Sequence, residues 1–190
     1  MRVKDEAKRI AIIDKTIDIV YEKGFAGIKM ASLAKQVGIS VSTLYVYYSS
    51  KEELIGKIYE ELIKKFASQS RKAIKPDLPF KLKLKSLWLY GIHLMINNNR
   101  EFSFFKQLKQ SPYAYLISEE TRSLNLELTF ELFDQGKKED LIKNIENDIL
   151  AEIMKAILSH TVSLIAGNKI NLNDEEMDLW YNFFWDAIKR

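Results

Sequence analysis

The chain has 190 residues, of which 47% are hydrophobic and 29% are charged, so it is long and apolar enough to bury a core. It contains no cysteine, which excludes disulfides, thiolate zinc sites and cysteine nucleophiles. Only three prolines and seven glycines interrupt it, and long runs that alternate Val and Thr are absent, so mostly helical structure is expected.

The charge is unevenly placed, although the net charge is only +3. Residues 1–51 hold nine basic and five acidic residues, whereas the remainder holds 20 basic and 21 acidic ones. This asymmetry indicates either a polyanion contact near the N-terminal end or a solvated charged helix. The first ten residues lack the apolar core of a signal peptide, and no window reaches about 18 uncharged apolar residues, so a cytoplasmic protein without membrane contact is expected.

The first predicted helix covers residues 4–23 and ends at Gly24. Its apolar residues recur at intervals of three and four, which gives one stripe along the helix. The stripe is formed by Ala7, Ile10, Ile13, Ile17 and Val20.

Two short helices follow, Met30–Val37 and Val41–Tyr47, with a tight turn at Gly38 between them and Ser40 as the N-cap of the second. Such a pair behind a stabilising helix is a helix-turn-helix, in which the second helix enters the major groove of DNA and the first crosses the backbone. Apolar residues that would hold the pair together are Leu33, Ala34, Val37, Ile39 and Leu44.

A longer helix runs from Lys51 to about Ala73, with Ser49 or Ser50 as its cap. The clearest break in the chain follows at residues 75–79. Further helices are predicted over Phe80–Ile96, Glu101–Gln110, Tyr113 to about Lys138, about Asn147–Ala166, and Asp174–Lys189. The expected fold is therefore all-α with about nine helices: a helix-turn-helix domain over residues 1–52 and a larger ligand-binding and dimerisation domain over residues 53–190.

The outward side of the second short helix is the candidate DNA-binding surface. Hydroxyl groups suit phosphates, and apolar Val41 or Val46 could touch a thymine methyl group. Tyr45, Tyr47 and Tyr48 cannot all face inward on one helix, and Tyr48 is the best candidate for partial burial. The candidate DNA-binding residues are Lys29, Ser40, Val41, Ser42, Thr43, Tyr45, Tyr47, Tyr48 and Lys51.

Residues 8–55 resemble the N-terminal domain of the TetR family of transcriptional regulators. The resemblance rests on Gly24-Phe25, on Leu33 to Tyr48, and on the specific ending Leu44-Tyr45-Val46-Tyr47-Tyr48-Ser49-Ser50-Lys51-Glu52-Glu53-Leu54. It implies that Tyr45 and Lys51 contact DNA phosphates, and that Val41, Ser42, Thr43 and Tyr47 face the groove. The remaining two-thirds of the chain is similar only in length and helix pattern.

Two positions depart from the family pattern. Lys29 stands where the family often has a capping Thr or Ser, so either a charge contact replaces the hydroxyl or the cap is absent. Ser42 stands where the family often has Gly, and the base preference therefore does not carry over.

The resemblance also implies an inducer pocket among the middle helices, and this region is rich in aromatic residues. Such a pocket would suit an apolar, aromatic or acyl ligand, but aromatic residues at helical spacing are more often ordinary core. The candidate pocket residues are Trp88, His93, Phe105, Tyr113 and Phe130.

The last two helices, about 147–166 and 174–189, carry more apolar residues than one neighbour can cover. Packing against a second copy is the simplest solution, so a homodimer is expected, with a well-wrapped monomer as the alternative. The predicted function is a ligand-responsive repressor that binds a palindromic operator as this dimer.

The alternatives are a helical small-molecule-binding protein without DNA function and, with less support, a helical enzyme or a membrane-surface protein. No nucleophile elbow, P-loop or glycine-rich dinucleotide turn is found, and two distant histidines give no metal spacing. Neither catalytic residues nor a metal nor a cofactor are therefore expected.

Overall fold

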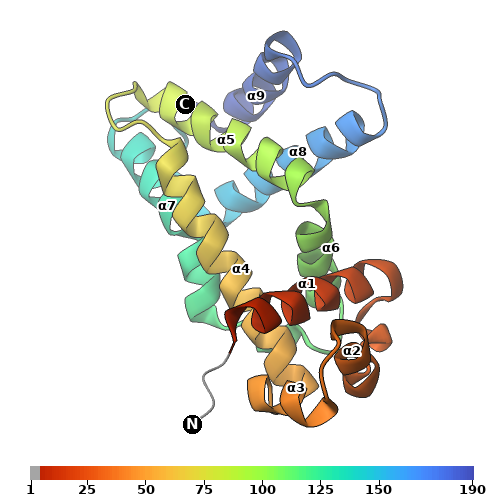
Figure 1. Cartoon of the computed structure of the whole chain (residues 1–190). Coiled ribbons are helices and arrows are strands. Elements are labelled where there is room, and N and C mark those ends of the chain that lie inside the picture. Colours follow the sequence, from red (N-terminus) through yellow and green to blue (C-terminus); the bar gives the residue numbers. More distant parts are fainter. Residues whose placement is uncertain (1–4) are drawn as a thin grey trace. The chain divides into compact units, whose positions relative to one another are not determined.

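The computed structural model describes residues 5–190 and is all-helical, as the sequence predicts (Figure 1). Within these residues there are nine α-helices and two short 3-10 helices, and the only strand-like pairing is an isolated bridge between Ile142 and Lys189. The elements are α1 (Glu6–Lys23), η1 (Phe25–Gly27), α2 (Met30–Val37), α3 (Val41–Tyr47), α4 (Lys51–Ala73), α5 (Phe80–Asn97), α6 (Asn99–Lys109), η2 (Ala114–Leu116), α7 (Glu119–Lys138), α8 (Asn147–Ala166) and α9 (Asp174–Ile188).

The chain divides into two compact units. Unit 1 comprises the residues up to Ile63 together with Asn98–Thr121, so α6 and η2 pack with the first three helices. Unit 2 comprises Lys64–Asn97 and Arg122–Arg190. The helix α4 belongs to unit 1 up to Ile63 and to unit 2 from Lys64 onwards.

The core of unit 1 lies between α1, α2 and α6. Helix α1 buries residues on two sides because α2 and α6 both contact it. An ion pair between Arg100 and Asp18 joins α6 to α1, and the Gln107 Nε2 donates to the Val20 carbonyl at 3.0 Å. The predicted apolar stripe of α1 is buried only from Ile13 onwards, because Ala7 and Ile10 lie in the first turns of the helix and are exposed.

The core of unit 2 is formed by α5, α7, α8 and α9. Trp88 of α5 lies 5.9 Å from Tyr181 of α9, ring centre to ring centre, and the Tyr181 hydroxyl donates to the Lys81 carbonyl at 2.7 Å. Gly136 of α7 faces the ring of Phe80, and a β-carbon at this position would lie 2.3 Å from the Phe80 Cζ. The Phe80 ring therefore leaves no room for a side chain at residue 136 unless the ring moves.

Most helix ends agree with the sequence-based prediction, and α7 is the exception. It begins at Glu119 and not at Tyr113, because the Ser118 Oγ accepts the backbone N–H of Thr121 at 3.2 Å and caps the helix there. Residues 114–116 form the separate η2 instead. At the other end of unit 2, Asn173 caps α9 by accepting the Glu176 N–H at 2.9 Å.

Within the described part of the chain, α8 is the one helix long and apolar enough to cross a membrane by length and composition. Only 22% of its most apolar window is buried. Leu150, Met154 and Leu158 of this helix face the core of unit 2, whereas Ile149 is exposed. The exposed side of the helix also carries charged residues such as Glu152, so the more apolar side is the one that unit 2 uses.

Candidate nucleic-acid interface

Helices α2 and α3 form the predicted helix-turn-helix. Leu33, Ala34 and Leu44 are fully buried and hold the two helices together, which confirms their assignment to the core. The turn has Gly38 in the left-handed conformation (φ 75°, ψ 29°), and its N–H bonds back to the end of α2. Ser40 caps α3, as predicted, by accepting the Thr43 N–H at 3.0 Å.

The side-chain cap of α2 is absent, whereas the charge contact of Lys29 with DNA stays a prediction. Its backbone occupies the N-cap position in an extended conformation, and its side chain makes no capping hydrogen bond. Lys29 is exposed, so the ammonium group is a free-standing positive charge at the start of α2.

The exposed face of α3 consists of Val41, Ser42, Tyr45 and Val46. Residues 41 and 45, and residues 42 and 46, are one helical turn apart, so they form two adjacent rows. Leu44 lies on the opposite, buried side. Three of the nine candidate DNA-binding residues, Val41, Ser42 and Tyr45, therefore share this accessible surface with Val46.

The three tyrosines of this region have different surroundings. Tyr45 is 48% exposed, whereas Tyr47 is 8% and Tyr48 5% exposed. Burial raises the pKa of the Tyr48 hydroxyl, and the nearby Glu61 carboxylate raises it further, so Tyr48 stays neutral. Of these three tyrosines, only Tyr45 presents its ring to an incoming partner.

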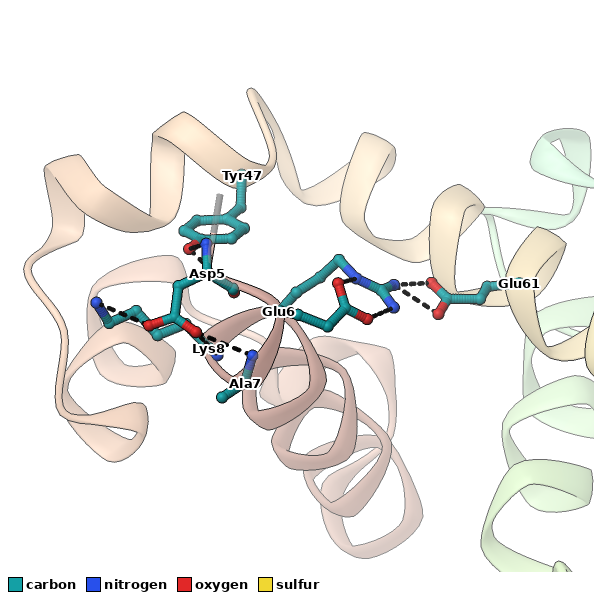
Figure 2. A network of polar contacts seen from close by, with 7 residues as sticks. Asp5, Glu6, Ala7, Lys8, Tyr47 and Glu61 are labelled. Carbon is teal, nitrogen blue, oxygen red and sulfur yellow. Dashed lines mark hydrogen bonds and ion pairs between the residues drawn. The ribbon is translucent and has the colours of Figure 1, made fainter. Parts of the chain in front are cut away.

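The Tyr47 hydroxyl is held at the start of α1 (Figure 2). It accepts the backbone N–H of Asp5 at 2.8 Å and donates to the Asp5 carbonyl at 3.2 Å. The Asp5 carboxylate in turn caps α1 by accepting the N–H of Ala7 at 3.0 Å. Hydrogen bonding from Lys8 lowers the pKa of the Asp5 carboxyl group. Tyr47 thus joins the end of α3 to the first turn of α1.

Arg9 of α1 forms ion pairs with two carboxylates, those of Glu6 and Glu61. Its guanidinium donates to Glu6 in the same helix and to Glu61 in α4. Hydrogen bonding from Arg9 lowers the pKa of the Glu6 carboxyl group and keeps it ionised. Because Arg9 is already paired, the exposed positive charges of α2 and its N-cap, among the described residues, are those of Lys29 and Lys35.

Lys51 is half-buried, and its ammonium group has two partners. The Nζ donates to the Phe25 carbonyl at 2.7 Å and lies 5.2 Å from the centre of the Tyr113 ring. Phe25 itself packs against Tyr113 and Phe104, with ring centres 5.7 and 5.1 Å apart. The sequence could not indicate these contacts, since Tyr113 follows Lys51 by about 60 residues.

The five candidate pocket residues are divided between the units. Phe105 and Tyr113 belong to unit 1, where Phe105 packs against Tyr59 at 5.5 Å between ring centres. Trp88, His93 and Phe130 belong to unit 2. Trp88 is fully buried, and its Nε1 is one of two buried side-chain polar atoms that find no partner within residues 5–190. His93 is exposed, and Phe130 is partly buried against the core.

A surface groove lies elsewhere in unit 2, between α4 and α7. Its lining includes Arg71, Ser70 and Leu128, and it contains none of the five candidate pocket residues. Arg71 is paired with Glu127 and Glu131 of α7, at 2.7 and 2.9 Å. Over residues 5–190, no three side chains of His, Cys, Asp or Glu come together in a way that could hold a metal ion.

Two family models match the chain. Residues 12–58 match the bacterial regulatory proteins of the tetR family, and residues 79–189 match the tetracyclin repressor-like C-terminal domain. The second match alone covers more than half of the chain.

Individual relatives agree with the family models. An uncharacterized HTH-type transcriptional regulator of Haemophilus influenzae is 22% identical over 182 residues, 94% of each chain. The fatty acid metabolism regulator protein of Bacillus subtilis is 29% identical over 77 residues, and the match spans 40% of each chain.

The solved structures include a TetR family transcription regulator from Marinobacter aquaeolei with a TM-score of 0.84 and 25% identity, which covers 100% of this chain and 99% of that one. This likeness extends over both units and matches the helix-turn-helix and the helices that follow it. The chain therefore belongs to the TetR family and is a DNA-binding transcriptional regulator of the helix-turn-helix type.

Proposed function

We propose that the protein is a ligand-responsive repressor that binds a near-palindromic operator as a homodimer. In this proposal residues 1–52 contact DNA, and residues 53–190 bind the ligand and form the dimer. The observation that carries it is the exposed face of α3. This helix follows the turn at Gly38 and is capped by Ser40. A helix of this kind fits the major groove, which is about 12 Å wide.

Phosphate contacts would come from Lys29, Tyr45 and Lys51, with the hydroxyls of Ser40, Ser42 and Thr43 beside them. Lys29 and Tyr45 are exposed, so they can meet the DNA backbone without rearrangement. An ammonium group has three donors, and the Phe25 carbonyl uses one of those on Lys51. Lys51 can therefore keep this contact and still donate to a phosphate. Tyr47 and Tyr48 are buried, and we propose that they orient α3 from behind.

The dimer would form through α8 and α9. Ile149 of α8 and Leu179 of α9 are both more than half exposed, and Phe183 of α9 is 57% exposed. Trp180 stacks obliquely on Phe183 with ring centres 5.4 Å apart, and His160 of α8 lies 6.4 Å from Trp180. Exposed apolar side chains of this kind on two neighbouring helices suit a second copy related by two-fold symmetry. The same pairing would remove these exposed apolar side chains of α8 and α9 from water, as expected for a cytoplasmic protein.

The ligand would be an apolar molecule with an acyl chain. A structural relative, the transcriptional regulator FadR of Bacillus subtilis, was solved in complex with stearoyl-CoA, and it is similar in fold with a TM-score of 0.74 and 19% identity. In this chain the buried Trp88 Nε1 is a donor without a partner among the described residues, and it would suit a carbonyl acceptor. Such a ligand releases DNA only if its affinity is higher for the conformation that does not bind DNA than for the one that does.

The test is selection of bound duplexes from a random DNA pool by the full-length protein, with the Lys51→Ala variant alongside. We expect a palindromic consensus for the native protein. For Lys51→Ala we expect weaker binding to all sequences and a slope of log affinity against log salt that is smaller by about 1. A native protein that selects no consensus, in the presence or absence of acyl-CoA, would contradict the proposal.

A further inference from the structure

The recognition helix α3 has an unusual side-chain composition for a reader of bases. Its sequence, VSTLYVY, contains neither a charged residue nor a side-chain amide. The bidentate contacts that identify guanine come from Arg or Lys, and those that identify adenine come from Asn or Gln. This helix can make neither of them, so its specificity must come from other chemistry.

Hydroxyl groups supply little of that specificity. The Ser40 Oγ accepts the Thr43 N–H and also lies 2.9 Å from the Ser42 Oγ and 2.7 Å from the Thr43 Oγ1. These hydroxyls form one local network at the first turn of α3. A Ser or Thr hydroxyl can also donate or accept, so it fits several bases equally well.

The polar side chains of α2 do not replace the missing readers on α3. Gln36 is exposed, and its Nε2 donates to the Ser32 Oγ at 3.1 Å within the same helix. Lys29 and Lys35 are exposed on α2 as well. In a helix-turn-helix the first helix crosses the DNA backbone, so these groups are placed for phosphates.

What α3 does expose is apolar surface. Val41 is 40% and Val46 58% exposed, and Tyr45 lies between them on the helix surface. At 100° per residue, the four exposed residues 41, 45, 42 and 46 span an arc of about 140°, with one valine at each edge. The two valines are therefore directed toward the two sides of any groove that α3 enters.

We propose that Val41 and Val46 are specificity-determining residues that read the C5-methyl groups of thymine. Thymine is the one base that presents a methyl group in the major groove, and apolar side chains are its ordinary contacts. Each half-site would then carry thymine at two positions, one beneath each valine. This inference rests on the proposed function, in which α3 enters the major groove.

The experiment compares operator duplexes that differ only in methyl groups. After selection of the consensus, each thymine of a half-site is replaced in turn by deoxyuridine, which keeps the base pair and the O4 acceptor. We expect the affinity of the native protein to fall about fourfold for each contacted methyl that is removed. Thymines in the flanking sequence should tolerate the same replacement.

The protein side is tested with Val41→Ala and Val46→Ala. Each variant should lose the preference for thymine over deoxyuridine at one of the two positions and keep it at the other. Alanine favours helix, so α3 should stay intact, and the DNA substitutions do not depend on folding of a variant. Ile10→Ala, which shortens an exposed apolar residue of α1, should keep both preferences.

The outcomes separate the inference from the proposed function. A palindromic consensus whose affinity does not change with deoxyuridine would overturn the methyl readout and leave the helix-turn-helix assignment intact. A consensus without thymine in the half-site would overturn it as well. If the native protein selects no consensus, the proposed function fails and this inference fails with it.

Discussion

Two helical surfaces of this protein expose apolar side chains, and they differ in what surrounds them. On α3, two valines and a tyrosine stand beside hydroxyl groups, and exposed lysines lie nearby on α2. On α9, Leu179 and Phe183 are exposed and the Phe183 ring packs against Trp180, and Ile149 is exposed on the neighbouring α8. The first mixture suits the floor of a DNA groove, and the second suits another protein surface. Exposure of apolar residues alone thus does not identify a partner, whereas their neighbours do.

The largest effect should follow from charge placed on the second surface. The double variant Leu179→Asp, Phe183→Asp should be monomeric, because a two-fold interface would bring four carboxylates together. Operator affinity should fall by at least about 100-fold, since the two half-sites are then bound independently. Sedimentation and fluorescence anisotropy measure the two effects. Tyr115→Asp, which changes a residue that is 71% exposed on η2, should remain a dimer.

A second variant disturbs the core behind that surface and leaves α3 untouched. In Gly136→Ala the new β-carbon meets the Phe80 ring, which packs against Trp185 of α9 at 6.2 Å between ring centres. We expect a loss of about 1–3 kcal/mol in the free energy of unfolding, measured in urea. Adding Phe80→Leu should recover part of the loss, because the smaller side chain gives room. Equal stability of Gly136→Ala and the native protein would show that the Phe80 ring can move aside without cost.

High pH should weaken the attachment of α9 to α5. Burial raises the pKa of the Tyr181 hydroxyl, so the folded state keeps this proton at pH values where the unfolded state loses it. The contribution of the Tyr181 hydroxyl to the free energy of unfolding is complete below the unfolded pKa of about 10. Above this pH it declines by up to about 1.4 kcal/mol per pH unit. Urea unfolding at pH 8 to 11 measures the decline. Tyr181→Phe should make the free energy of unfolding less dependent on pH. If the slope of free energy against pH does not change in this variant, Tyr181 is not its source.

The smallest effect on stability is expected from a change at Tyr47, on the buried side of α3. Tyr47→Phe keeps the ring but removes both hydrogen bonds to Asp5, so it should cost about 0.5–1.5 kcal/mol of unfolding free energy. The selected DNA consensus should not change, because the side chain lies on the buried side of α3. A changed consensus would mean that Tyr47 turns toward the groove, as the family resemblance implies.

Features set by neighbouring residues could be predicted from the sequence. The turn at Gly38, the Ser40 cap and the bounds of α2 and α3 depend on residues within a few positions of one another. The buried Leu33, Ala34 and Leu44 follow from the same helical spacing. The start of α7 is also local, since it follows from Ser118 and the two Glu after it, which the predicted start at Tyr113 does not take into account.

Features set by distant residues could not be predicted. Tyr47 is buried because its hydroxyl meets the backbone of a residue 42 positions earlier, and neither spacing nor hydropathy reports that contact. Ile10 and the inward residues of α1 depend on α6, which returns to α1 after a long separation in sequence. Local patterns therefore located the recognition helix but not which of its tyrosines are accessible.

The return of α6 to α1 has a consequence for synthesis of the protein. Phe104 and Leu108 are fully buried in unit 1, yet they are translated after residues 64–97, which belong to unit 2. On the ribosome, part of the apolar surface of α1 to α3 therefore stays exposed to solvent until these side chains have been translated. A fragment that ends at residue 63 should likewise expose this surface and aggregate more readily than the full chain. Chaperone dependence during translation should thus be highest before α6 emerges.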